Sequence, residues 1–428
     1  MTTLNVGSQS DCGVIASASA GERVTSGGKV TRGWAATFVG AFALMFGPST
    51  LVTAIFGVFA AGVEAQTGWS HSAVSYASSI ISLMVLVTSP LQGVLADRFG
   101  GRRVVLTFVP LFGLALLALN FAVLSLTAFY ICCAALALTG MGLWPLAYMK
   151  VVAAWFDRRL GIAMGIVNVG IGVGATLYPI LFGFGYRTIG WTGVYTVLGV
   201  IVLLIVWPAN WRWLREAPPS VVSIDPLASA SGSTSLRTVL RSRVLWIGIA
   251  MFFTLGCINA ALLVHGIAIM KSRGVTLEVA LQLQALLGGC AVVARLGAGW
   301  LLDRMSVRSV GTMMFCAAAV SFGITSSELG SSLAPVAACL AGLVFGAEFD
   351  LLGVLIRRHL GNAVFGRVYG VTFAFFHLGG AFGAASLSYL LAQTHSFVSG
   401  LQVLILASLV CVVLVLAIGR DPVHGEGR

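Results

Sequence analysis

The stretch GVLADRFGGRR at Gly93–Arg103 lies at the end of a long apolar run. A shorter copy of it, GWLLDR at Gly299–Arg304, lies at the end of another apolar run 206 residues later. A charged turn that recurs at the same place in two halves indicates a duplicated bundle of membrane helices. Duplicated bundles of this kind typically carry small solutes across a membrane. The pattern therefore predicts a transport-type architecture before any single residue is considered.

The composition agrees with a membrane protein. Apolar residues make up 58% of the 428 residues and charged residues 9%, with a mean hydropathy of +0.98. A soluble domain carries roughly a quarter charged residues, so this chain has too few charges to cover a surface in water. Each apolar run approaches the ~20 residues needed to cross a hydrocarbon core of ~30 Å, and in lipid such a run must be a helix. We predict an all-α integral membrane protein with twelve spans, at 33–61, 71–95, 104–125, 128–150, 160–185, 192–209, 244–270, 279–302, 309–326, 333–356, 366–392 and 397–419.

These spans divide into two pseudo-symmetric six-helix bundles, at 33–209 and 244–419. Residues 210–243 are polar and contain five Arg, which predicts a cytoplasmic linker between the bundles. Residues 1–32 are rich in Ser, Gly and Thr and contain no apolar core of a cleavable signal, which predicts a disordered cytoplasmic tail. Residues 420–428 are predicted to be a second cytoplasmic tail.

Glycines also repeat between the two halves. At a constant separation of 205 residues, Gly161, Gly165 and Gly174 of the fifth run correspond to Gly366, Gly370 and Gly379 of the eleventh. Two independent correspondences at nearly the same separation predict a true internal duplication.

The basic residues predict the orientation. If both termini are cytoplasmic, the inner loops and tails hold 20 of the 25 Lys and Arg residues, and the outer loops hold Arg187, Lys271 and Arg273. This bias accounts for the formal net charge of +11 without a basic folded face of the kind that binds nucleic acid. We predict a monomeric, multi-pass protein of the inner (plasma) membrane.

The stretch GVLADRFGGRR resembles the conserved loop between helices two and three of the major facilitator superfamily. The similarity spans about residues 35–415 and implies that fold, with alternating access and a conformational gate at the charged turns. Further stretches resemble its monocarboxylate-porter and oxalate/formate-exchanger branch: GWSHS at Gly68–Ser72, WFDRRLGIAMG at Trp155–Gly165, Gly190-Trp191, Val264-His265, Gly274, and ARLG at Ala294–Gly297.

The sequence departs from that branch at three positions. Some members carry a Lys in helix one, whereas Arg32 precedes the first span here and 33–61 holds no cation. Some carry an Asp one turn before the Arg of helix eight, where this chain has Ala291. Oxalate-type members have a second cation, a Lys, in helix eleven; here that position has no Lys, and the nearest counterpart is His377. These departures favour a monoanion over a small dicarboxylate.

The intramembrane charge that most indicates function is Arg295. It lies roughly 9 Å inside the end of the predicted eighth span, at ~1.5 Å per residue. Inserting a charged side chain at that depth costs ~2.5–3.5 kcal/mol on insertion scales, and such a charge usually has a function. Its guanidinium can hold a carboxylate through two parallel hydrogen bonds. The alternative is a structural ion pair, or a side chain that reaches the inner surface.

Glu348 and Asp350 lie at a similar depth in the predicted tenth span. Two residues apart, they face different sides of a helix, so at most one faces Arg295. A carboxylate that alternates between Arg295 and a proton would couple transport to protons. A static gate pair with Arg295, Arg357 or Arg358 is the alternative.

Four further polar residues are candidates for contact with the substrate. His265 and His377 can donate a hydrogen bond to a carboxylate or titrate near neutral pH, and Asn259 and Asn168 lie in the middle of spans seven and five. The alternative for each is hydrogen-bonded packing between helices. An aromatic wall, again with ordinary packing as the alternative, is predicted from Trp144, Tyr148, Tyr178, Phe373 and Phe376.

The charged turns are predicted to gate the cytoplasmic side. Asp97 can accept hydrogen bonds from the N-terminus of a neighbouring helix and pair with nearby Arg residues. These contacts would hold the cytoplasmic side closed and so stabilise an outward-open state. Asp303 is expected to matter less, because its copy lacks the later Gly and the paired Arg. The predicted gate residues are Gly93, Asp97, Arg98, Arg102, Asp303 and Arg304.

Together these features predict a secondary active transporter for a small organic acid anion, a monocarboxylate with aromatic acids among the candidates, carried by proton symport. Anion exchange and efflux of an amphipathic compound are alternatives, as is a transporter-like sensor. The eight cysteines have no metal-ligand spacing and no nucleophile motif is evident, so we expect no enzyme activity, metal or cofactor.

Overall fold

The computed structural model describes residues 31–156, 159–218, 240–327 and 330–418. Residues 1–30 of the predicted N-terminal tail, all of the predicted C-terminal tail and the centre of the predicted linker lie outside these ranges, whereas Thr31 and Arg32, which were assigned to the tail, begin the first helix. Within them, twelve helical stretches are long and apolar enough to cross a membrane, which confirms the predicted fold class. They are Thr31–Leu51, Ser79–Phe99, Gly101–Leu124, Leu126–Trp155, Leu160–Tyr178, Thr188–Trp213, Arg243–Ser272, Leu277–Leu302, Val307–Ser326, Ala334–His359, Phe365–Thr394 and Phe397–Leu416.

The N-terminal half is the more irregular of the two. One of its helices, α7, contains the fifth span and the start of the sixth, which meet at Gly190, where φ is +71°. Only glycine adopts that conformation without strain. After the first helix, the elements are α2 (Pro48–Thr67), α3 (His71–Phe99), α4 (Gly101–Ala118), η1 (Leu119–Leu124), α5 (Leu126–Thr139), η2 (Gly140–Leu143), α6 (Pro145–Trp155), α7 (Leu160–Ile201), η3 (Val202–Val206) and α8 (Trp207–Trp213).

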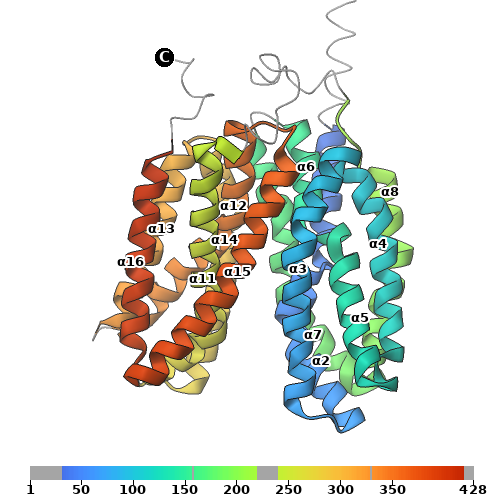
Figure 1. Ribbon diagram of the computed structural model, residues 1–428, viewed down its shortest axis with the longest axis horizontal. Coiled ribbons are helices and arrows are strands. Elements are labelled where there is room, and N and C mark those ends of the chain that lie inside the picture. Colours follow the sequence, from blue (N-terminus) through green and yellow to red (C-terminus); the bar gives the residue numbers. More distant parts are fainter. Residues whose placement is uncertain (1–30, 157–158, 219–239, 328–329, 419–428) are drawn as a thin grey trace, which may run out of the picture.

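In the C-terminal half each span is one helix. Three of these helices begin with a Ser or Thr whose hydroxyl accepts a hydrogen bond from the first turn, as at Thr276, Ser306 and Ser396. Figure 1 shows this bundle beside the N-terminal bundle. Its helices are α11 (Arg243–Ser272), α12 (Leu277–Leu302), α13 (Val307–Ser326), α14 (Ala334–His359), α15 (Phe365–Thr394) and α16 (Phe397–Leu416).

Two predicted spans are not the single helices that the apolar runs suggested. The first is interrupted at Phe46-Gly47 and resumes at Pro48, the first residue of α2. The fourth changes to a tighter helix at Gly140–Leu143 and resumes at Pro145 of α6. Proline has no amide hydrogen and suits the first turn of a helix, so a proline begins each second segment. Hydropathy alone does not distinguish such breaks from a continuous helix.

The sixth span ends later than predicted, at Trp213 rather than at residue 209. Arg102 explains this end, because its side chain donates hydrogen bonds to the carbonyls of Leu214 (2.6 Å) and Trp211 (3.1 Å). A cation at a helix C-terminus satisfies carbonyls that have no partner within the helix. These hydrogen bonds stabilise the last turn of α8, which also contains the cation Arg212.

Glycines mediate the approach of the two halves. A Cβ on Gly93 of α3 would lie 2.2 Å from the Gly366 carbonyl of α15, and one on Gly161 of α7 would lie 2.2 Å from the Gly299 carbonyl of α12. The two crossings are equivalent under the duplication. The predicted repeat of charged turns and glycines is thus confirmed as a repeat of helix crossings.

Candidate functional site

The first helix crossing carries a carboxylate contact between the halves. Asp97, near the end of α3, accepts hydrogen bonds from the backbone amides of Gly366 (2.8 Å) and Arg367 (2.9 Å) at the start of α15. Its side chain is 1% exposed and also pairs with Lys150 of α6 and with Arg367. The N-terminus of a helix presents free amides and positive potential to an anion. The contact expected for Asp97 is therefore present.

The second crossing repeats this geometry. Asp303, at the end of α12, accepts hydrogen bonds from the amides of Gly161 (2.7 Å) and Ile162 (3.0 Å) at the start of α7. Burial raises the pKa of Asp303, whereas the two amides and nearby Arg358 and Arg304 act in the opposite direction. We call the end of the molecule that holds both crossings the closed end.

Among the described residues, three of the predicted gate residues form no ion pair within 4 Å with Asp97 or Asp303, although Arg304 acts on Asp303 electrostatically. Arg102 holds the end of α8 within its own half, Arg98 lies over Phe99, and Arg304 stacks on Trp300 at 4.0 Å. Only Gly93, Asp97 and Asp303 of the predicted gate set occur in the two crossings. Two cations of the closed end do join the halves. Arg367 pairs with Asp97, and Arg357 donates from its Nε to the Ala153 carbonyl at 3.1 Å. Lys150 pairs with Asp97 within the N-terminal half.

Removing the charge of Asp97 should weaken this end selectively. Asp97→Asn loses the pairing with Lys150 and part of the amide contact, at about 1.5–3 kcal/mol for hydrogen bonds to a charged group. We expect slower turnover in reconstituted vesicles with normal expression and folding. Asp303→Asn is the matched control: it loses the corresponding part of its amide contact, but among the described residues it has no lysine partner, so it should slow transport less. Unchanged turnover in Asp97→Asn would remove this residue from the gate.

A buried cation, Arg295, lies on α12 eight residues before Asp303. Arg295 of α12 is 7% exposed, and its side chain reaches along α7, with Nε 3.9 Å from where a Cβ on Gly172 would lie. Nε and Nη1 are buried without a hydrogen-bond partner. Among the described residues, no ion pair within 4 Å involves this guanidinium. Its donors are thus available to an anion.

Two acids of α14 lie within electrostatic reach of Arg295 but are held by asparagines. Asp350 is fully buried and accepts a hydrogen bond from Asn168 of α7 at 2.6 Å, while its second oxygen has no partner. Glu348 is 3% exposed and accepts from Asn259 of α11 with both oxygens, at 3.0 and 3.2 Å. The two carboxylates therefore face different helices, as their spacing predicted. The Asp350 contact joins the halves, whereas the Glu348 contact stays within one.

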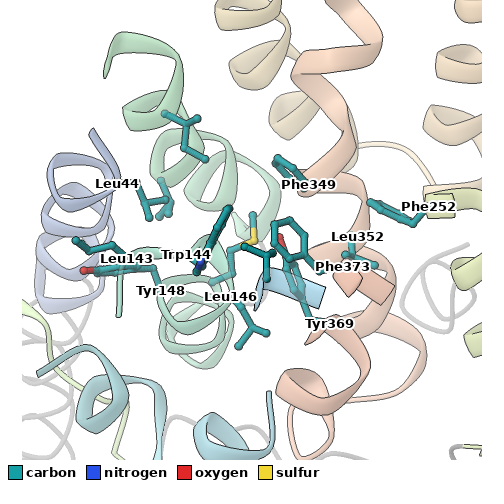
Figure 2. Close-up of a cluster of buried hydrophobic side chains, with 14 of the residues drawn as sticks. Leu44, Leu143, Trp144, Leu146, Tyr148, Phe252, Phe349, Leu352, Tyr369 and Phe373 are labelled. Atoms are coloured by element: carbon teal, nitrogen blue, oxygen red, sulfur yellow. The ribbon is translucent and has the colours of Figure 1, made fainter. Parts of the chain in front are cut away.

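Aromatic rings from both halves meet beside α14, and Figure 2 shows Trp144, Phe349 and Phe373 among them. Trp144 points toward Phe373, with ring centroids 5.4 Å apart, and Phe349 lies 5.5 Å from Phe373. Phe376 stacks on Phe373 at 6.0 Å. Of the predicted wall, Trp144, Phe373 and Phe376 are brought together, and we call these three with Phe349 the aromatic cluster.

The other two members of the predicted wall lie inside the N-terminal half. Tyr148 packs against the first helix, where its ring is 3.1 Å from where a Cβ on Gly40 would lie. Tyr178 neighbours Phe46 and Phe182. Both rings are nearly fully buried and fill the bundle, so packing describes them better than an aromatic wall.

The two predicted histidines occupy different environments. His377 lies beside the aromatic cluster, 4.6 Å from Phe373 and 5.8 Å from Trp144, and one ring nitrogen bonds the Phe373 carbonyl at 3.0 Å. His265 instead contacts the Ala384 carbonyl and the Ser388 hydroxyl, both at 3.2 Å. Ser388 is eleven residues beyond His377 on α15, or roughly 16 Å at ~1.5 Å per residue. The structure thus brings His377 to the centre but not His265.

Sequence reasoning missed two residues of this region. Lys150 pairs with Asp97 at the closed end, and a lysine inside an otherwise apolar span was a signal that could have found it. Tyr369 is fully buried with its hydroxyl unpartnered, one turn before Phe373 on α15. Nothing in the linear sequence separates this tyrosine from ordinary packing residues.

The family follows from comparison with known proteins. The family model described as Major Facilitator Superfamily matches residues 37–384, which is most of the chain. This chain belongs to the major facilitator superfamily, and its resemblance to that family is confirmed. It is a secondary transporter of that superfamily and not an enzyme.

Curated relatives are distant. The chain is 25% identical to Monocarboxylate transporter 13 of Rattus norvegicus over 84% of this chain and 82% of that one. It is 24% identical to MFS-type transporter 1 of Ophiocordyceps sp., over 68% of this chain and 63% of that relative. A 33% identity to the 3-(3-hydroxy-phenyl)propionate transporter of Escherichia coli covers 44% of each chain.

Solved structures support the fold. The proton:xylose symporter XylE superposes with a TM-score of 0.70 at 14% identity, over 91% of this chain and 96% of that one. A bacterial homologue of the iron transporter ferroportin in an outward-facing state superposes with a TM-score of 0.68 at 15% identity, covering 91% and 98%. At these identities the likeness concerns the fold alone.

Proposed function

We propose that this transporter moves a small organic acid anion, a monocarboxylate, and that Arg295 binds its carboxylate. The observation that carries the proposal is the buried guanidinium whose Nε and Nη1 have no partner. Buried guanidinium donors without a hydrogen-bond partner are costly, and a carboxylate offers both acceptor oxygens and a matching planar geometry. A substrate that brings this carboxylate would remove the cost while it is bound.

The surroundings of Arg295 support an aromatic or similarly apolar acid. The aromatic cluster packs beside His377 and Tyr369, and its Phe349 lies between Glu348 and Asp350 in the sequence of α14. An apolar pocket with a few placed polar groups is the usual design of a small-molecule site. Names of the relatives support the same class, since they include monocarboxylate transporters and a transporter of a phenylpropionate.

For coupling, we assign the proton to Asp350 rather than Glu348. Asp350 bonds Asn168 across the two halves and has a free second oxygen, so movement of the halves must change its partner. Both oxygens of Glu348 accept from Asn259 of the neighbouring helix, and that contact can persist during the movement. Alternation of one carboxylate between a neighbouring polar group and a proton would link proton transfer to the conformational change.

We place the closed end in the cytoplasm of a cell whose inner membrane holds the protein. This assignment rests on the Lys and Arg distribution, 20 in the inner loops and tails and three outside. The halves meet at that end, in the crossings of α3 with α15 and of α7 with α12. In this orientation, the end at which the halves are held together faces the cytoplasm.

The orientation has a direct test in reporter fusions. A reporter after Arg428 and one inserted within 220–235 should both report the cytoplasm, and one near Lys271 should report the outside. The 20-to-3 bias of basic residues is the reason. An external report from the 220–235 insertion would overturn the assignment.

The proposed function is tested by uptake into proteoliposomes of a panel of labelled monocarboxylates, aliphatic and aromatic, with and without an imposed pH gradient. We expect saturable uptake of at least one acid, stimulated when the outside is more acidic. Uptake that requires a trapped anion and ignores the pH gradient would replace symport by exchange. Transport of neutral amphipathic compounds with no acid transported would overturn the proposal in favour of efflux.

A further inference from the structure

Basic residues gather at the end of the N-terminal half where α4 begins and α8 ends. These two helices pack together on the side away from the C-terminal bundle (Figure 1), so their outer faces meet lipid. We call the segments 101–107 and 207–218 the basic corner. Their charged residues are four arginines and one glutamate, namely Arg102, Arg103, Arg212, Arg215 and Glu216. Glu216 accepts a hydrogen bond from the Arg102 amide at 2.9 Å, and the corner keeps an excess of positive charge.

Two tryptophans of α8 belong to this corner, and only one of them is explained by the packing of the helices. Pro110 of α4 has no amide hydrogen, so the Leu106 carbonyl one turn earlier lacks its helical partner. Trp207 donates from Nε1 to that carbonyl at 3.1 Å, which holds its indole on α4. Trp211, one turn later, is 61% exposed. Among the described residues, no hydrogen bond involves its indole N–H.

The contacts between α4 and α8 bring a cation to the level of this free indole. Trp207 bonds the Leu106 carbonyl, and Arg102 donates to the Trp211 carbonyl at 3.1 Å, so the first turn of α4 lies beside Trp211. Arg103, in that turn, is exposed. No ion pair of the described residues involves its guanidinium. An exposed guanidinium and an exposed N–H donor therefore lie at one level of the membrane-facing surface.

An apolar surface continues from this polar pair toward the middle of the membrane. Leu114 lies eleven residues after Arg103, which places both on the same face of α4 at 3.6 residues per turn, and it is exposed. Leu111 of α4 and Leu204 of the sixth span, which is 71% exposed, are also on the surface. Cationic and N–H donor groups at one end of an apolar surface match the two parts of a phospholipid.

Comparison of the two halves shows that the fold does not require this arrangement. At the separation of 205 residues, Arg103 corresponds to Arg308 at the start of α13, but Trp211 corresponds to Leu416 at the end of α16. A π-helical turn (η3) precedes α8, whereas α16 is one regular helix. The second half thus keeps the cation without the indole and provides a matched control within the same chain.

We propose that the basic corner binds an anionic phospholipid, with its phosphate at Arg103 and Trp211 and its acyl chains along the exposed leucines. A guanidinium binds phosphate through charge-assisted hydrogen bonds, and tryptophan suits the membrane interface. Basic sites between membrane helices on the cytoplasmic side bind anionic headgroups. The choice of the cytoplasmic leaflet rests on the proposed orientation. The binding site is independent of the transported acid and of Arg295.

The test titrates the purified full-length transporter in micelles with phosphatidylglycerol and with phosphatidylcholine of the same acyl chains. Native mass spectrometry counts the bound lipids. Glycerol 3-phosphate, added alone, separates a lipid site from a site for soluble phosphate. Arg103→Gln removes the exposed cation, and Trp211→Leu introduces the residue of the other half while keeping the carbonyl that Arg102 bonds. Arg308→Gln removes the same charge at the equivalent place. The melting temperature of each variant shows that it is folded.

We expect wild-type protein to bind phosphatidylglycerol about five- to tenfold more tightly than phosphatidylcholine, as one or more basic residues at the surface imply. Arg103→Gln should remove most of this preference, Trp211→Leu should weaken phosphatidylglycerol binding about two- to tenfold, and Arg308→Gln should change neither. Equal affinity of wild type for both lipids would overturn the proposal, as would an unchanged preference in both corner variants. An equal loss in Arg308→Gln would assign the effect to net charge, and glycerol 3-phosphate bound as tightly as the lipid would make this a soluble-phosphate site; either result refutes the lipid site.

Discussion

Arg295→Ala should abolish binding of the acid while leaving any binding of its uncharged amide unchanged. The guanidinium is buried with free Nε and Nη1 donors, and no other described cation is buried near the aromatic cluster. Arg295→Lys keeps the charge but loses the planar, two-pronged geometry. We expect its affinity for the acid to fall by about 1.5–3 kcal/mol, or roughly ten- to a hundredfold. Calorimetric titration of the purified variants with the acid and its amide measures both effects.

A structural role for Arg295 predicts a different pattern. If its charge served mainly to compensate Asp350 and Glu348, Arg295→Ala would leave buried carboxylates uncompensated and lower the melting temperature. Neutralising one acid in the same chain would then restore stability. The melting temperature of Arg295→Ala is therefore measured beside its affinity. Retained affinity for the acid in a destabilised protein would refute the binding role.

Asp350→Asn should uncouple transport from protons. The variant cannot take up a proton at this position, yet its amide oxygen can still accept the hydrogen bond of Asn168. We expect accumulation driven by a pH gradient to fall to the level reached without a gradient, while exchange of labelled for unlabelled acid continues. Paired measurements of gradient-driven uptake and of exchange in the same vesicles separate the two processes.

Glu348→Gln is the matched control for this experiment. It neutralises an equally buried acid of the same helix, whose contact with Asn259 stays within the C-terminal half. We expect this variant to keep its response to the pH gradient. If Glu348→Gln loses coupling and Asp350→Asn retains it, the proton belongs to Glu348. If both variants keep coupling, neither acid carries the proton.

Much of the fold was predictable because each decisive signal is local. Hydropathy runs of about membrane length predict helices wherever backbone groups must be satisfied in lipid, and the twelve spans agree with that expectation. The duplication was readable from the charged turns and from glycines at constant separation. The asparagines and acids of the centre were also identifiable, because polar residues inside spans are rare and conspicuous.

The breaks at Gly47-Pro48 and Gly140–Leu143 were not readable from hydropathy, since both segments of each broken span remain apolar. The two breaks also lie against each other, since a Cβ on Gly47 would lie 2.5 Å from the Leu143 carbonyl oxygen, and this contact depends on how distant parts of the sequence pack. Likewise, the separation of His265 from His377 depends on which helix each residue contacts.

By itself, the sequence determined the class of protein, the number of spans, the duplication and the set of polar residues from which a site could be built. The tertiary structure alone decided how those residues pair: Asp350 with Asn168 across the halves, Glu348 with Asn259 within one, and Arg295 with free donors. The physical reason is that insertion into lipid depends on each segment separately. Pairing depends on distances between segments far apart in the chain, 182 residues for Asn168 and Asp350 and 270 for Asp97 and Arg367, which only helix packing sets.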